Sequence, residues 1–179
     1  MNIAFITEMG WNGKVPNTHT NMRTEFAWMY ALNANHYSIQ DAINSKVIDY
    51  DHVFLIFPKG KLNLNAEGSV ISNQVNPVSN YLKEDIVSKL KNNNKKVYYV
   101  QEGPTWWFCD YNIQDQILFY NLLTSVDAIY AHNQYDISFY KGLVPNQTVH
   151  SIKTLMVETL IQDIKPDPNP KVLIGGNFS

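Results

Sequence analysis

Short apolar runs alternate with helix-patterned stretches along most of the chain, and this alternation limits the fold more than any other feature. The apolar runs have the length of buried strands and lie at residues 3–7, 52–57, 96–100, 128–131 and 148–152. The helix-patterned stretches lie at residues 22–33, 78–90, 112–124, 136–143 and 155–164. Such alternation builds a parallel sheet with right-handed crossovers and helices on both faces. We therefore predict a Rossmann-like, three-layer α/β sandwich with a mostly parallel sheet.

Composition excludes several classes of function. Of the 179 residues, 45% are hydrophobic, which is enough for one well-buried core, and the net charge of -2 gives no electrostatic basis for binding nucleic acid or a membrane surface. Cys109 is the single cysteine, so an internal disulfide and a multi-cysteine zinc site are excluded. No apolar run reaches the roughly 20 residues of a membrane span, and the first residues lack a signal-peptide pattern. We expect a cytoplasmic protein without a membrane span.

Proline spacing near the carboxyl terminus indicates a domain boundary. Residues 165–170 alternate proline with polar residues, as stiff interdomain linkers do. Residues 171–179 then have the pattern of a new strand that enters a glycine turn. We predict a first domain over residues 1–164, a linker over 165–170 and the start of a second domain over 171–179. The alternative is a last edge strand of the same sheet.

The loop after the first predicted strand is the first candidate binding segment. Glycines there let the backbone approach a ligand, and the following helix start offers free N–H groups to an anion. The candidate binding residues of this segment are Gly10, Trp11, Gly13, Lys14 and Arg23, the last being the only arginine in the chain. The spacing is not that of a dinucleotide-binding fingerprint. The alternative is an ordinary turn in which Arg23 pairs with a nearby glutamate.

The loop after the strand at residues 96–100 is the second candidate. It carries Trp106 and Trp107 between two carboxylates, Glu102 and Asp110. Aromatic faces with carboxylates at the rim suit a sugar or nucleoside ring, and either acid is a candidate general base. The alternative is structural: the indoles form an apolar lid over the core, and Asp110 caps the following helix.

Two histidines fall where a parallel sheet binds its ligands. His19 lies in the first loop and His132 directly follows the strand at residues 128–131, and each is a candidate base or ligand contact at neutral pH. His36, His52 and His150 fall where core or surface roles are expected. The chain has no histidine–carboxylate spacing typical of a metal site, so we predict no metal and no bound cofactor.

Several segments resemble the amino-terminal domain of GT-B glycosyltransferases, in particular those encoded by tailed phages. The resemblance spans most of the chain as a pattern, without a short diagnostic motif. Its segments are Asn2–Ile6 running into Gly10-Trp11-x-Gly13-Lys14-x-Pro16, Asn21–Trp28, Tyr50–Phe54, Gln101–Pro104 with Trp106-Trp107, Asp127–Asn133, Val149–Met156 and Val172–Phe178.

The resemblance implies a sugar transferase whose acceptor hydroxyl attacks the anomeric carbon of a UDP- or GDP-linked sugar. The present chain would be the acceptor-binding half, inactive alone, with Glu102, Asp110 and His19 as base candidates and no tightly bound metal. The acceptor would be a carbohydrate or a modified base in viral DNA, and the location the host cytoplasm if a phage encodes the chain. The alternatives are a non-catalytic α/β module that binds a nucleotide or a protein, and a nucleoside-processing hydrolase of flavodoxin-like fold. The oligomeric state is left open.

Overall fold

A computed structural model describes residues 1–7, 13–14, 24–44, 47, 49–56, 86–101, 105–110, 113–153 and 155, without the side chains of residues 24, 25, 40, 43, 106, 107 and 110. The elements in chain order are β1 (Ile3–Thr7), α1 (Thr24–Ala31), β2 (Asn35–Ser38), α2 (Ile39–Ile43), β3 (His52–Leu55), α4 (Ile86–Lys91), β4 (Lys96–Val100), the 3-10 helix η1 (Thr105–Asp110), α5 (Ile113–Ser125), β5 (Ala128–Ala131), α6 (Gln134–Leu143) and β6 (Val149–Ser151).

The described strands form one six-stranded sheet in the order β2-β1-β3-β4-β5-β6, and every neighbouring pair is parallel. The chain first steps from β1 to β2 on one side and then continues from β3 on the other side of β1. This is a doubly wound arrangement with the flavodoxin-type order extended by a sixth strand. The predicted α/β class with a parallel sheet is confirmed. Five strands were predicted between residues 3 and 152, and that number was wrong because the structure has a sixth strand, β2.

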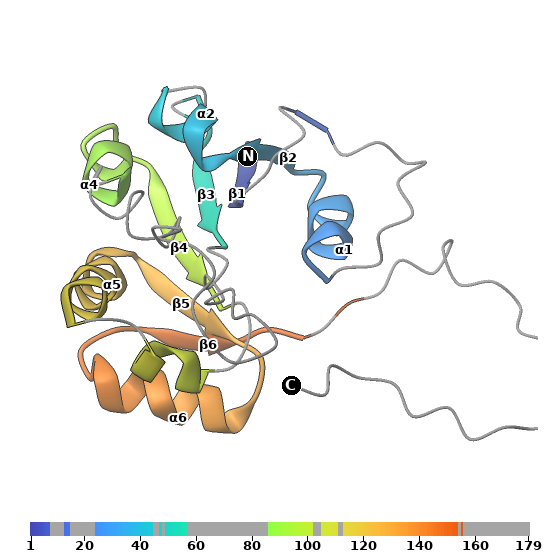
Figure 1. The fold of residues 1–179 in the computed structure, drawn as a ribbon. Helices are drawn as coiled ribbons and strands as arrows, with labels where there is room; N and C mark the ends of the chain where they lie inside the picture. Colours follow the sequence, from blue (N-terminus) through green and yellow to red (C-terminus); the bar gives the residue numbers. More distant parts are fainter. Residues whose placement is uncertain are drawn as a thin grey trace, which may run out of the picture.

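Helices cover both faces of the sheet, so the described part has three layers (Figure 1). Alternate residues of β1 show why, because Ala4 and Ile6 join the core beneath α2, α4, α5 and α6, while Ile3 and Phe5 join the core beneath α1. A strand buried on both faces has a continuous apolar sequence. That is the reason the apolar runs predicted β1, β4 and β5 with correct boundaries.

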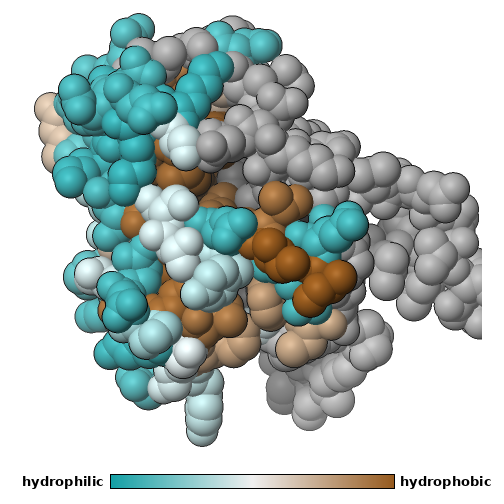
Figure 2. Space-filling model, turned by 90° about the vertical axis from the view of Figure 1, so that its left-hand side faces the viewer, coloured by the Kyte–Doolittle hydropathy of each residue, from teal (hydrophilic) through white to brown (hydrophobic). Residues whose placement is uncertain are grey.

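The outer surface of the layer that holds α4, α5 and α6 is largely hydrophilic (Figure 2). Brown apolar side chains interrupt it at mid-height in that view. The exposed large apolar residues of this layer are Ile113, Ile117 and Tyr120 on α5, and Tyr135 on α6.

A row of aromatic rings crosses the sheet face on the α1 side. Phe5 stacks on Phe54 at 4.9 Å between ring centroids, Phe54 meets Tyr98 at 4.8 Å, and Tyr98 meets Tyr130 at 5.8 Å. His150 of β6 closes the row against Tyr130 at 5.3 Å. Ring pairs on neighbouring strands contribute roughly 0.2–1 kcal/mol each, so the row ties five strands together.

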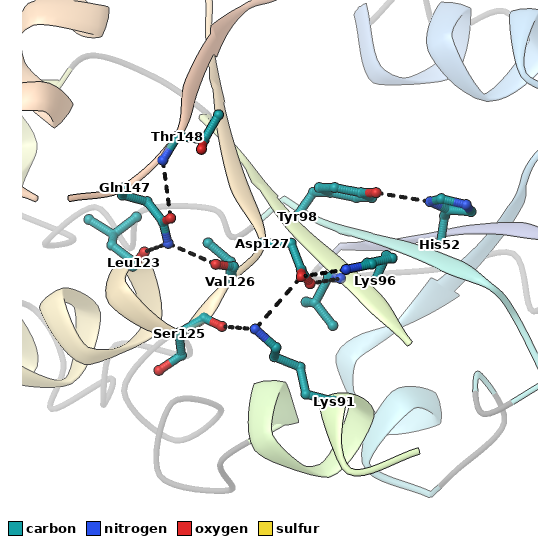
Figure 3. A network of polar contacts seen from close by, with 11 residues as sticks. His52, Lys91, Lys96, Tyr98, Leu123, Ser125, Val126, Asp127, Gln147 and Thr148 are labelled. Atoms are coloured by element: carbon teal, nitrogen blue, oxygen red, sulfur yellow. Dashed lines mark hydrogen bonds and ion pairs between the residues drawn. The ribbon is translucent and has the colours of Figure 1, made fainter. Parts of the chain in front are cut away.

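A polar network holds the amino ends of β4 and β5 (Figure 3). The carboxylate of Asp127 accepts the Val97 backbone N–H at 2.9 Å and the Lys96 ammonium at 3.2 Å, with the Lys91 ammonium at 3.8 Å. The Gln147 amide donates to the backbone carbonyls of Leu123 and Val126, at 2.7 Å in both cases. These contacts lie at the edge of the sheet opposite the ends where parallel sheets bind ligands, and we assign them a structural role.

Candidate functional site

The carboxyl ends of all six described strands share one edge of the sheet. The direction of winding reverses between β1 and β3, and ligands of doubly wound proteins bind outside the carboxyl ends near such a reversal. The polar groups that the structure places along this edge include Thr7 at the end of β1, Ser38 at the end of β2, Gln101 after β4 and His132 after β5. They define the candidate site.

The imidazole ring of His132 is held in a fixed orientation. Its Nε2 lies 2.9 Å from the backbone carbonyl of Gln101, which can only accept, so Nε2 carries the proton and Nδ1 carries a lone pair. That Nδ1 is buried and has no hydrogen-bond partner. An acceptor left unpaired in the interior costs roughly 1–3 kcal/mol.

The indole of Trp28 fixes the plane of the His132 ring. The two rings are stacked with centroids 5.6 Å apart and planes 15° from parallel. The Trp28 Nε1–H in turn donates to the backbone carbonyl of Lys153 at 3.0 Å. The imidazole is therefore held through its edge by β4 and through its face by α1, and α1 is itself tied to the chain after β6.

The turn after His132 is also rigid. Asn133 is the N-cap of α6, and its side-chain oxygen accepts the backbone N–H groups of Tyr135 and Asp136 at 2.9 and 3.0 Å. Its amide nitrogen donates to the Asp136 carboxylate at 2.6 Å. Capping starts the helix at Gln134, two residues earlier than the sequence predicted, and places His132 at the junction of strand and helix.

At the far side of the same edge, Thr7 and His36 form a second polar pair. The Thr7 hydroxyl lies 2.7 Å from His36 Nε2, and the Phe26 ring meets the imidazole edge-on at 5.7 Å. His36 is 2% exposed, so of the core and surface roles expected for it the structure shows a position in the core. β3 and β4 lie between this pair, which is on β1 and β2, and the strand β5 that His132 follows.

Gly13 and Lys14 of the first predicted segment lie at the outer edge of β2, away from His132. Gly13 exchanges both backbone hydrogen bonds with His36, at 3.0 and 2.6 Å, in an isolated antiparallel bridge. The Lys14 ammonium donates to the backbone carbonyl and, at 2.8 Å, to the side chain of Asn33, at the carboxyl end of α1. This cation therefore neutralises a helix terminus. The other residues proposed there, Gly10, Trp11, His19 and Arg23, lie outside the described residues.

Only part of the aromatic loop after β4 is described. Its residues 105–110 form η1, and Phe108 anchors this turn in the core against Phe119 at 5.9 Å and Phe139 at 6.1 Å. Cys109 beside it is exposed. The side chains of Trp106, Trp107 and Asp110 and the whole of Glu102 lie outside the described residues, so their proposed roles stay predictions.

Two contributors to the site were not predicted from the sequence. Trp28 was predicted only as part of a helix, and Gln101 only as the residue that opens the aromatic loop. A buried polar residue directly after an apolar strand is the signal that could have singled out Gln101, which is 2% exposed.

Two tyrosine hydroxyls have strongly raised pKa values. Burial, followed by the hydrogen bond with the Tyr50 hydroxyl at 2.6 Å, raises the pKa of Tyr37 to about 12. Burial also raises the pKa of Tyr140 above its usual range. Both hydroxyls stay protonated at neutral pH, which suits structural hydrogen bonding and excludes them as general bases there.

Among the described residues, no three His, Cys, Asp or Glu side chains gather closely enough to hold a metal ion. Within the same ranges, none of the helices has the length and apolar character needed to cross a lipid bilayer.

Comparison with known proteins finds a solved structure that is similar in fold, but it assigns the chain to no family. No family and no curated protein matches the sequence. Among solved structures, the chain is similar to the pyridoxal kinase from Entamoeba histolytica, with 17% sequence identity and a TM-score of 0.40. The match covers 79% of this chain and 53% of the kinase, so this chain spans about half the length of that protein. A likeness of this degree carries no argument about activity.

Proposed function

We propose that the carboxyl edge around His132 binds a small molecule that bears a hydroxyl group, and that the chain is the acceptor-binding half of a GT-B glycosyltransferase. The observation that carries the proposal is the oriented imidazole, whose Nδ1 is a buried acceptor without a partner at the ligand-binding edge of a parallel sheet. The resemblance of several sequence segments to that family supports sugar transfer as the reaction.

In the proposed reaction the acceptor hydroxyl donates its hydrogen bond to His132 Nδ1. The hydroxyl oxygen attacks the anomeric carbon of the donor as the bond from that carbon to the phosphate oxygen breaks. UDP or GDP leaves with the bonding electron pair, and Nδ1 takes the proton. The Gln101 carbonyl that accepts from Nε2 stabilises the imidazolium that forms, as the orienting group does in other histidine bases.

The other residues singled out from the sequence have expected roles in the same reaction. Trp106 and Trp107 would provide an aromatic surface for the acceptor ring, and Glu102, Asp110 and His19 are alternative bases. The acceptor is a carbohydrate or a hydroxylated base, and the proposal requires no tightly bound metal. A second domain would bind most of the nucleotide-sugar.

The test is nucleotide release by the complete gene product, measured with UDP- and GDP-sugars and a panel of glycoside acceptors. His132→Gln keeps an N–H donor at the distal position and removes the base, while His132→Asn keeps a polar atom near the position of Nδ1. We expect His132→Gln to lower kcat about 10²- to 10⁴-fold with little change in donor KM, and His132→Asn to lose less. Trp107→Ala should raise the acceptor KM with a smaller effect on kcat.

Other results of this assay would indicate a different function. Release of nucleotide at the same rate with and without acceptor would identify a hydrolase. Ligand binding without turnover would identify a binding module. A turnover that is equal in the wild type and in His132→Gln would remove His132 from the reaction and refute the proposed mechanism.

A further inference from the structure

α5 carries two apolar stripes on opposite sides, and only one of them faces the core. Its buried apolar residues are Phe119, Leu122 and Leu123. On the opposite side Ile113, Ile117 and Tyr120 are 68%, 53% and 42% exposed. A solvent-facing side of a helix normally carries charged residues, so this stripe requires an explanation.

The spacing of the exposed stripe is that of a helix-pairing seam. Ile113, Ile117, Tyr120 and Thr124 follow one another at steps of four, three and four residues. This is the a/d spacing of heptad repeats, which places one line of side chains along a helix for packing against a second helix. The stripe therefore fits a helical partner better than an extended peptide.

The positions beside the seam indicate which helix. The single charged residue of α5 is Asp115, which is 8% exposed and turned to the core side. The flanks of the seam carry Gln114, Gln116 and Asn121. In an interface between identical copies each side chain meets residues of its own patch, so a patch of one charge would repel itself. Amides both donate and accept, and they pair well in such an arrangement.

We propose that two copies of this chain associate through α5, with the two helices antiparallel about a two-fold axis. Matching the seam residues in this direction places Ile117 against the partner's Tyr120, and Ile113 against the partner's Thr124. Gln114 then lies across from the partner's Asn121. The interface is closed by symmetry, so it yields a dimer and not a filament.

A cavity at the end of the seam is in the position that this pairing needs. It measures about 90 Å³ and lies between α5 and the connection from α6 to β6. Its lining residues are Tyr120, Thr124, Val144, Pro145, Asn146 and Gln147. The partner's Ile113, placed against Thr124, inserts its side chain there and fills the cavity with an apolar group.

The first test is the molar mass of the full chain in solution, measured by light scattering over a concentration series. We expect a dimer for the wild type and about a tenfold or larger increase in the dimer dissociation constant for Ile117→Lys. Tyr135→Lys is the matched control, because Tyr135 is 89% exposed but lies on α6, and this variant should stay dimeric. Circular dichroism checks that both variants are folded. A monomeric wild type at roughly 100 μM, or a dimer that Ile117→Lys leaves intact, overturns the proposal.

A charge-swap experiment tests whether the partner is a second copy in the proposed direction. One variant combines Gln114→Glu with Asn121→Glu, and the other combines Gln114→Lys with Asn121→Lys. Each should be monomeric alone because like charges then face one another, and a mixture of the two should form a heterodimer. A mixture that stays monomeric, while both variants are folded, would show that these positions do not meet across the interface. Neither test depends on sugar transfer.

Discussion

Replacement of Asp127 tests the account of how the amino ends of the strands are held. Its carboxylate accepts the Val97 backbone N–H, which joins β4 to the start of β5, and its side chain is 21% exposed. A hydrogen bond to a charged group contributes roughly 1.5–3 kcal/mol, whereas the pairs with Lys96 and Lys91 contribute at most about 1 kcal/mol each because both lysines are well exposed. Asp127→Asn retains an acceptor for the Val97 N–H and should cost about 1 kcal/mol. Asp127→Ala leaves the Val97 N–H without an acceptor and should lower the free energy of unfolding by about 2–3 kcal/mol.

The assay is the free energy of unfolding from urea titrations at neutral pH, with Lys96→Gln as the control that removes only a surface pair. The order of the losses should be Asp127→Ala, then Asp127→Asn, then Lys96→Gln. Equal losses for the two Asp127 variants would show that the backbone hydrogen bond contributes nothing, and would refute the reasoning.

The same carboxylate has a defined pH dependence. Burial acts to raise the pKa of Asp127, but the Val97 hydrogen bond and the Lys96 ammonium outweigh it and hold the pKa below the ordinary value of 3.8. A lowered pKa in the folded state means that the stabilisation is complete above pH 3.8 and is lost as the pH falls through the folded-state pKa. The difference in stability between the wild type and Asp127→Asn should therefore shrink below pH 3.8.

Three further substitutions test local features by thermal or urea unfolding. Gly13→Ala should cost about 1–2 kcal/mol of folding free energy, because the backbone φ of 144° strains a residue with a Cβ even though the space around it is open. A Gly13→Asn variant as stable as the wild type would contradict this backbone-strain argument. Asn133→Ala should cost about 1 kcal/mol by removing the cap of α6, with Asn133→Ser closer to the wild type. Trp28→Phe keeps a ring against His132 but loses the N–H that donates to the Lys153 carbonyl, and should cost about 1 kcal/mol. An unchanged stability would mean that this hydrogen bond is not formed in solution.

Burial explains which elements were predictable from the sequence. β1, β4 and β5 are covered on both faces and therefore appear as continuous apolar runs, and their predicted boundaries are confirmed. β2 has the sequence Asn-His-Tyr-Ser, and its strand conformation depends on pairing with β1, from Ala4 opposite Asn35 to Thr7 opposite Ser38. Pairing between distant segments leaves no periodic pattern in a four-residue stretch, so β2 and the adjoining α2 were missed.

The candidate site was predictable only in part. The position of His132 directly after an apolar strand was sufficient to place it at the carboxyl edge of the sheet, which is where it lies in the structure. The orientation of its ring depends on Trp28 and on the Gln101 carbonyl, which come from other elements and which no local spacing connects to His132. The domain boundary at residues 165–170 and the paired indoles lie outside the described residues and side chains, so those predictions stand as made.

The hydrogen bond from Trp28 to Lys153 joins positions 125 apart in the sequence. A ribosome that has released only the first five strands has therefore produced the imidazole and its carbonyl partner, but not the acceptor that secures the indole. A nascent chain that ends before Lys153 would therefore carry an indole whose N–H lacks this acceptor, beside the imidazole that the indole supports.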